Sequence, residues 1–203
     1  MTATAQPDVT AERTSRRSSS PGRDVALVAA FAALISASAY IGAIPVGSAG
    51  VPITLQTLTV MLAGCVLGPA RGFSAVALYL ALGAVGLPVF AEHSAGIGVF
   101  AGPSGGYLVA FPVAAALAGF LVEYVARERR TRALVVFACS ITASVLVVHL
   151  FGIVGMMLHF DVSFRQAGIW DMPFWVGDVV KTSLVAMIAA EVHRAFPQLL
   201  QRD

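Results

Sequence analysis

The sequence of 203 residues has little charge, because only 12% of its residues are Asp, Glu, Lys or Arg, whereas 58% are hydrophobic. Soluble domains carry about 25% charged residues. This shortage excludes a water-exposed globular domain and predicts an integral membrane protein.

Cysteine and phosphate-binding patterns are also scarce. Cys65 and Cys139 both lie in apolar runs, without a CxxC pattern or a metal-ligand spacing. We therefore expect no disulfide framework, no metal site and no cofactor. The stretch "GDVVKT" lacks the second glycine that a phosphate-binding loop has before its lysine, so we do not expect the chain to hydrolyse ATP.

Apolar runs dominate what is present, and they predict an all-α membrane protein with six transmembrane helices. The run before "SASA" (36–39) continues through Ile44, which favours a first transmembrane helix over a cleaved signal peptide. We expect a disordered basic cytoplasmic tail over 1–23, a transmembrane domain over 24–196 and a short cytoplasmic tail over 197–203. The six apolar segments lie at about 25–44, 53–69, 72–90, 106–126, 133–158 and 173–195.

Lys and Arg are distributed very unevenly between the predicted loops. With the N-terminus inside, only Arg165 of the 13 Lys and Arg residues lies outside, and Lys181 lies within a helix. This asymmetry predicts that both termini are cytoplasmic. The remaining eleven are Arg13, Arg16, Arg17, Arg23, Arg71, Arg127, Arg129, Arg130, Arg132, Arg194 and Arg202.

The predicted outer loops span 45–52, 87–105 and 159–172. The middle loop has no Lys or Arg and is rich in glycine, which a flexible tether would also show. However, Phe90, Ile97, Val99 and Phe100 are too apolar for a merely solvated tether. We expect this loop to pack down as a lid.

Asp178 and Lys181 are the charged residues that lie inside an apolar segment away from its ends. An isolated ion at bilayer depth costs roughly 2.5–3.5 kcal/mol on insertion scales. The pair could form a mutual salt bridge on one helix face, or it could belong to a polar site inside the bundle. A helix starting near Pro173, capped by Asp171, would place the pair about 8 and 12 Å below the outer surface.

Further polar residues are predicted near the outer surface, namely Gln56, Glu92, His93 and Tyr107. Their position favours capture of a substrate from outside. His149, in the middle of the fifth segment, is expected to be a satisfied interior histidine. A channel or secondary carrier would need a continuous polar path or an internal repeat, and neither is visible. His149, Cys139 and Asp178 have no enzyme-like spacing, so we expect no enzyme.

Four motifs carry a resemblance that covers about residues 24–196. In this order, "VPITLQTLTVMLAG", "GLPVFA", "GPSGGYLVAF" and "PFWVGDVVKT" look like the BioY family, the biotin-specific substrate-binding (S) components of energy-coupling factor (ECF) transporters. The chain departs from the family in "EHSAG" after "GLPVFA", where many relatives carry Asn and further Gly. Ser104 stands where Thr is common.

This resemblance implies an S-component fold in the cytoplasmic membrane, with biotin held near the outer face under the loops before helices two, four and six. It implies a transmembrane T component and two ATPase subunits as partners, although a solitary biotin carrier remains the alternative. Asp178 and Lys181 match the family's GDxxK positions, which are taken to bind biotin.

The chemistry of biotin fits this pair without the family name. Asp178 can accept a ureido N–H while Lys181 donates to the adjacent ureido oxygen. Phe174, Trp175 and Tyr107 could cover the ring system. The biotin carboxylate could then meet backbone N–H groups of the glycine-rich loop. The substrate-binding candidates are therefore Asp178, Lys181, Gln56, Tyr107, Glu92, Phe174 and Trp175.

The first helix carries a stripe of small residues, Ala26, Ala29, Ala30, Ala33 and Ala37. Small residues let membrane helices approach closely. The stripe could serve ordinary packing within the chain. In the S-component interpretation it faces the T component, with Ala29, Ala33 and Ala37 as docking residues.

Overall fold

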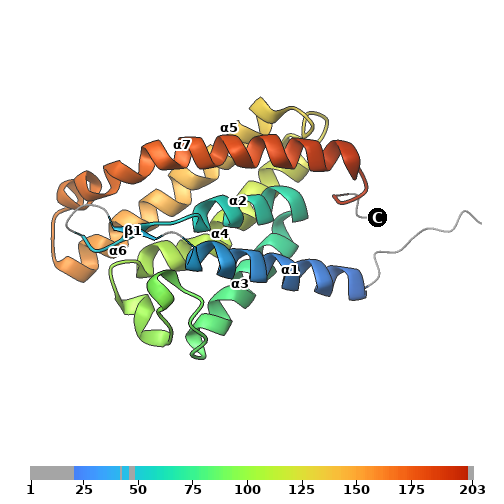
Figure 1. Cartoon of the computed structure of the whole chain (residues 1–203). Helices are drawn as coiled ribbons and strands as arrows, with labels where there is room; N and C mark the ends of the chain where they lie inside the picture. The colour runs from blue at the N-terminus through green and yellow to red at the C-terminus, as the bar shows by residue number, and fades with distance from the viewer. Residues whose placement is uncertain (1–20, 42, 46–48, 201–203) are drawn as a thin grey trace, which may run out of the picture.

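The computed structural model describes residues 21–41, 43–45 and 49–200. Residues 1–20 of the predicted basic tail and residues 201–203 lie outside this part of the chain. The described residues form a bundle of helices that lie side by side, with α7 running along its whole length (Figure 1). Two short strands pair antiparallel, with Ile44 opposite Ile53.

The helices follow one another with short joints, as the glycine and proline punctuation predicts. Helix α4 continues into the π-helical turn η3, and α5, η4 and α6 form one continuous run from Ala133 to Phe160. In chain order the elements are α1 (Pro21–Tyr40), β1 (Ile44–Pro45), β2 (Pro52–Ile53), α2 (Gln56–Leu67), α3 (Pro69–Ala84), η1 (Ala91–His93), η2 (Ile97–Ala101), α4 (Gly105–Phe120), η3 (Leu121–Val125), α5 (Ala133–Ala143), η4 (Ser144–His149), α6 (Leu150–Phe160) and α7 (Phe164–Ala195).

Each predicted apolar segment contains a helix, so the all-helical class is confirmed. Within the described residues, four helical runs are long and apolar enough to cross a membrane: Pro21–Tyr40, Gly105–Val125, Ala133–Phe160 and Phe164–Ala195. Helices α2 and α3 have 12 and 16 residues, fewer than the roughly 20 that cross the hydrocarbon core. The count of six spans therefore stays a prediction.

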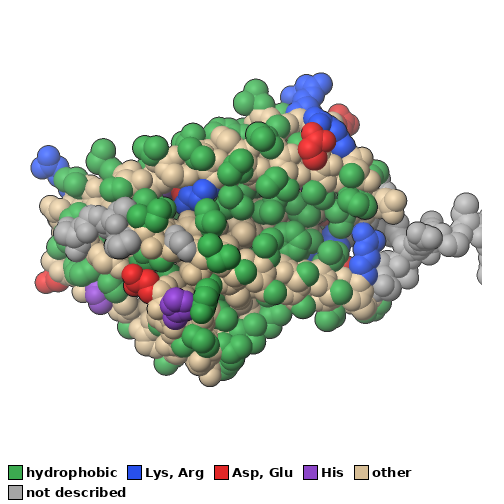
Figure 2. All heavy atoms as spheres, viewed as in Figure 1, with side chains coloured by type: hydrophobic (Ala, Val, Ile, Leu, Met, Phe, Trp, Pro, Cys, Tyr) green, Lys and Arg blue, Asp and Glu red, His purple; other side chains and the backbone are tan. Residues whose placement is uncertain are grey.

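The outer surface of the bundle is apolar, as contact with lipid requires. Hydrophobic side chains cover most of the face in Figure 2, and Lys and Arg lie chiefly toward one of its ends. Leu134 and Val176 are 79% and 75% exposed. Exposed side chains of this size on most helices are what a lipid-facing surface shows.

Glycines bring the central helices into close contact. A Cβ added at Gly64 of α2 would lie 2.2 Å from the backbone oxygen of Ala115 in α4. A Cβ at Gly106 of α4 would lie 2.8 Å from the Cα of Gly155 in α6. Such backbone contact is typical of packed membrane helices, and it fixes α4 between its neighbours.

The predicted start of the last helix is wrong. Helix α7 begins at Phe164, and the Ser163 side chain caps it by accepting from the Gln166 amide at 3.2 Å. Pro173 lies inside the helix, where a membrane protein can tolerate it because neighbouring groups satisfy the freed backbone. Asp171 is therefore not a cap. It lies in the second turn of α7 and is fully buried.

The described residues overlap both predicted tails by a few positions. Helix α1 begins at Pro21, so residues 21–23 belong to the helix. At the other end, Leu199 and Leu200 fold back and are buried. The Arg71 guanidinium holds this end, because it donates to the Leu199 carbonyl and to the Asp24 carboxylate. Both ends of the described chain thus lie at the same end of the bundle (Figure 1).

Candidate functional site

A cavity of about 250 Å³ is lined by segments that lie toward the other end of the bundle in Figure 1. Its walls come from the 50–57 segment, the 90–104 loop and helices α4 and α7, together with Val148 and His149 of η4. Its size is close to the lower end of small-molecule sites, which span about 300–1,000 Å³. The lining is mostly apolar, and its polar side chains are Thr54, Gln56, Thr57, Glu92, Ser94, Ser104, Tyr107, His149, Asp178 and Lys181.

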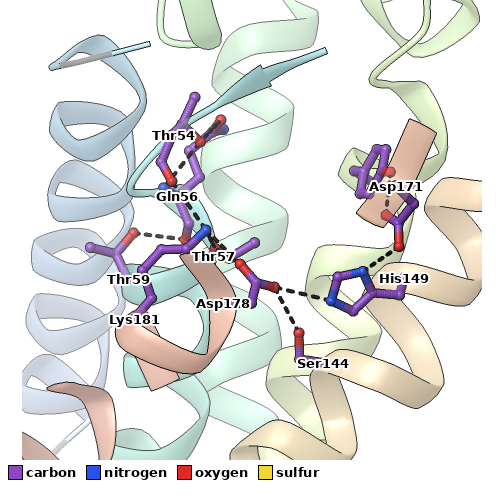
Figure 3. Close-up of polar contacts among 10 residues, drawn as sticks. Thr54, Gln56, Thr57, Thr59, Ser144, His149, Asp171, Asp178 and Lys181 are labelled. Carbon is purple, nitrogen blue, oxygen red and sulfur yellow. Dashed lines mark hydrogen bonds and ion pairs between the residues drawn. The ribbon is translucent and has the colours of Figure 1, made fainter. Parts of the chain in front are cut away.

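Asp178 and Lys181 form an ion pair within this lining, with 2.5 Å between Lys181 Nζ and Asp178 Oδ1. Both side chains are buried, and a buried pair is stable only when further hydrogen bonds satisfy it. Thr57 Oγ1 accepts from Lys181 at 2.5 Å and donates to Asp178 Oδ1 at 3.2 Å. Ser144 Oγ donates to Asp178 Oδ2 at 3.0 Å (Figure 3). The predicted salt bridge and the predicted polar site are therefore one arrangement.

Gln56 lies beside this pair at the start of α2. Its Oε1 accepts from Thr54 Oγ1 at 2.9 Å, and its Nε2 donates to the Tyr79 hydroxyl at 2.5 Å. These two contacts fix the direction of the amide. Gln56 thus presents a fixed polar group to the cavity instead of a freely rotating one.

A second buried carboxylate, Asp171, lies behind the cavity-lining residue Tyr107 and is not itself part of the lining that the structure describes. Its Oδ1 accepts from the Tyr107 hydroxyl at 2.7 Å, and its Oδ2 accepts from Trp175 Nε1 at 2.7 Å. His149 Nδ1 also lies 2.7 Å from Oδ2. Gly152 makes room for the Tyr107 ring, because a Cβ there would lie 2.1 Å from it. Asp171 therefore orients three aromatic side chains at once.

Six of the seven predicted substrate-binding residues line the cavity, and Trp175 is the exception among the described residues. Trp175 is 43% exposed, and its ring stacks on His149 with 4.6 Å between ring centroids. Phe174 lines the cavity instead, 5.7 Å from the Tyr107 ring. Glu92 lies on the exposed rim, in the left-handed backbone region with φ of 55°. His93 packs on Tyr40 and does not appear in the lining that the structure describes.

Sequence reasoning missed Thr57, Ser144 and the true role of Asp171. It also treated His149 as a satisfied interior residue, whereas His149 lines the cavity and its Nε2 lies 3.4 Å from Asp178 Oδ2, within ion-pair range but without hydrogen-bond geometry. Thr57 could have been found, because it follows Gln56 directly in a motif already singled out. Ser144 and His149 offered only the signal of polar residues in an apolar run.

The 87–105 loop packs against the bundle, as its apolar residues predict. Phe90 is 1% exposed and makes edge-to-face contacts with Tyr79 and Phe100, at centroid distances of 5.5 and 5.7 Å. The Gly96 amide donates to the Gly83 carbonyl of α3 at 2.7 Å. Ile97, by contrast, is exposed. The packed part of the loop forms the cavity wall.

Replacing Gly83 by alanine should loosen this loop, although alanine favours a helix over glycine by up to about 1 kcal/mol. The new Cβ would lie 2.1 Å from the Phe90 ring, so Phe90 must move. Overpacking of this kind costs about 1–3 kcal/mol. We expect a lower thermal unfolding temperature and faster proteolysis within the loop. Gly98→Ala is the control, because nothing lies within 4 Å of its Cβ position. A Gly83→Ala protein as stable as the wild type would contradict the packing role of Phe90.

The helical bundle, its apolar surface and its polar cavity define an integral membrane protein that binds a small molecule. Comparison with solved structures agrees with this class. The chain is similar to a crystal structure of the S-component for biotin from an ECF-type ABC transporter, with a TM-score of 0.81 and 28% sequence identity over 85% of this chain and 92% of the other.

The chain belongs to the BioY family, whose pattern matches residues 11–198. It is 39% identical over 190 residues to the biotin transporter BioY of Rhodobacter capsulatus, covering 88% of this chain and 97% of that one. It is 42% identical over 172 residues to the probable biotin transporter BioY of Pyrococcus horikoshii, covering 84% and 96%. These names confirm the resemblance seen in the sequence and the prediction of a transport protein that is not an enzyme.

Proposed function

We propose that this chain is the biotin-binding S component of an uptake system in the cytoplasmic membrane. It captures biotin from the outer face in the cavity between the 87–105 loop and α7. A separate T component and two ATPase subunits supply the energy. The family and its named relatives support biotin as the substrate.

The observation that carries this proposal is the buried Asp178–Lys181 pair in the cavity wall. A ureido group places an N–H donor beside a C=O acceptor, and this pair offers a carboxylate acceptor beside an ammonium donor. Phe174 and Tyr107 provide an apolar surface for the ring system. Gly102 and Ser104 also line the cavity, so backbone N–H groups near them could hold the biotin carboxylate.

Heat protection by biotin tests this proposal on the isolated protein. A ligand at 100 times its Kd adds about 2.7 kcal/mol to the free energy of unfolding. We expect excess biotin to raise the thermal unfolding temperature of the detergent-purified chain, and some biotin to co-purify with it. The proposal would be contradicted if the purified protein contained no biotin and its unfolding temperature did not change when biotin was added.

The distribution of Lys and Arg predicts that both termini are cytoplasmic. The two ends of the described chain lie at the same end of the bundle, which supports this orientation (Figure 1). Single cysteines at positions 20 and 95, in a background with Cys65 and Cys139 replaced by alanine, should label from opposite sides. Ala95 is exposed in the loop that we place outside. An impermeant thiol reagent that labels position 20 in intact cells would show that the orientation is wrong.

The alanine stripe of α1 supports an external partner. Ala26, Ala29, Ala30, Ala33 and Ala37 are all exposed, so they do not serve packing among the described residues. The buried face of α1 is instead formed by Ala32, Ile35, Ser38 and Ala39. In the alternative, a solitary biotin carrier, this stripe would have no coupling role. Biotin uptake measured in cells that lack a T component and its ATPases discriminates between the S component and the solitary carrier, because only the solitary carrier would still transport biotin.

A further inference from the structure

Two buried carboxylates of α7 face one histidine from opposite sides. His149 Nδ1 lies 2.7 Å from Asp171 Oδ2, and His149 Nε2 lies 3.4 Å from Asp178 Oδ2 (Figure 3). All three side chains are at most 3% exposed. His149 therefore links the Asp178–Lys181 pair to Asp171, deeper in the wall.

The proton on His149 Nδ1 follows from the partners of Asp171. A carboxylate has no proton to give, and Asp171 already accepts from Tyr107 and Trp175. The close contact with Nδ1 is thus an N–H donated to Asp171. This leaves Nε2 as the atom that decides the charge of the ring.

Nε2 faces a second carboxylate. Asp178 pairs with Lys181 and accepts from Thr57 and Ser144, and these contacts favour its ionised form. A neutral imidazole would turn the lone pair of Nε2 toward Asp178 Oδ2, so that two acceptors would face each other. A proton on Nε2 removes this repulsion and makes the ring an imidazolium.

The charge balance of the cluster also favours an imidazolium at His149. Asp171, Asp178 and Lys181 together carry a net charge of −1, and an uncompensated buried charge is costly. An imidazolium brings the cluster to neutrality. Its stack on Trp175, at 4.6 Å between centroids and 26° between planes, is also favourable for a cation.

We propose that His149 is a permanently charged positioning residue of the substrate site. Asp171 fixes the orientation of the His149 ring by accepting from Nδ1. The imidazolium in turn attracts Oδ2 of Asp178, so that this carboxylate keeps one orientation toward a substrate that donates an N–H. His149 is then a second cation of the site beside Lys181. The affinity part of this inference rests on the proposed biotin function, while the charge of His149 does not.

A charge-balanced set of variants tests the positioning role by biotin titration. His149→Gln leaves Asp171 without its cation, and Asp171→Asn leaves the imidazolium without its anchor. We expect each single variant to lose about tenfold or more in affinity. The double variant removes one positive and one negative charge together, so its loss should be clearly smaller than the product of the two single losses. Losses that multiply, or single variants that bind like the wild type, would overturn the proposal.

His193→Gln is the matched control, because His193 is also almost fully buried but its Nε2 donates to the Cys65 carbonyl, and His193 is not among the described residues that line the cavity. Its biotin affinity should stay within a few-fold of the wild type.

Nitrogen NMR of the wild-type protein measures the charge of His149 without any ligand. With ¹⁵N-labelled histidine, both ring nitrogens of His149 should show the shifts of an imidazolium at neutral pH. The signal is assigned by its absence in His149→Gln. A neutral-ring pattern would overturn the inference even if biotin binds. If wild-type protein binds no biotin, the proposed function fails, and the NMR result still decides the charge.

Discussion

Lys181→Ala is expected to weaken biotin binding by a factor of about a hundred or more. Losing a hydrogen bond from a charged donor and leaving its buried acceptor unsatisfied costs about 1.5–3 kcal/mol or more, and each 1.4 kcal/mol corresponds to a factor of about ten in affinity. The alanine leaves Asp178 beside the cavity without its ammonium and removes the proposed donor to the ureido oxygen. Lys181→Arg restores the charge with a different geometry, so its loss should be smaller.

Direct titration of the purified variants with biotin measures this effect. Ser183→Ala is a suitable control on the same helix, because Ser183 donates to the Val179 carbonyl and is not among the described cavity residues. It should bind like the wild type. Wild-type affinity in Lys181→Ala would remove the role that we give to the pair.

Ala33→Leu is expected to reduce biotin uptake by about tenfold while biotin affinity stays within a few-fold. Ala33 is exposed on α1, in the middle of the alanine stripe, and does not appear in the described cavity lining. A leucine there would hold a partner helix away where close approach stabilises the contact. Co-purification of the T component should fall together with uptake.

The neighbouring Ala32 supplies the contrast for this experiment. Ala32 is 1% exposed, so Ala32→Leu should overpack the bundle and destabilise the isolated protein by about 1–3 kcal/mol. Ala33→Leu should leave the stability of the isolated protein unchanged. If uptake and co-purification both survive Ala33→Leu, the stripe is not the coupling surface.

Hydropathy and charge were sufficient to predict the helical membrane class and the polar pair. Lipid excludes charge so strongly that Asp178 and Lys181 stand out in any apolar run. The packing of the 87–105 loop was also predictable, because residues such as Phe90 have no reason to be in a solvated loop. These features depend on composition within one segment.

Features that depend on contacts between segments were not predictable. Asp171 looked like a helix cap because it precedes Pro173, yet its partners Tyr107 and His149 are 64 and 22 residues away. Helix α7 begins at Phe164 instead, with Ser163 as its cap and Pro173 inside it. The charge of His149 likewise follows only from two carboxylates that meet it in space.

Equilibrium binding of labelled biotin to the purified chain, without any partner protein, tests the central claim most directly. We expect one saturable site per chain that unlabelled biotin competes for. The affinity of this site should fall by a factor of about a hundred or more in Lys181→Ala and stay within a few-fold of the wild type in Ala33→Leu. The absence of saturable binding to the wild-type chain, or a site that Lys181→Ala leaves unchanged, would contradict biotin capture at the Asp178–Lys181 pair.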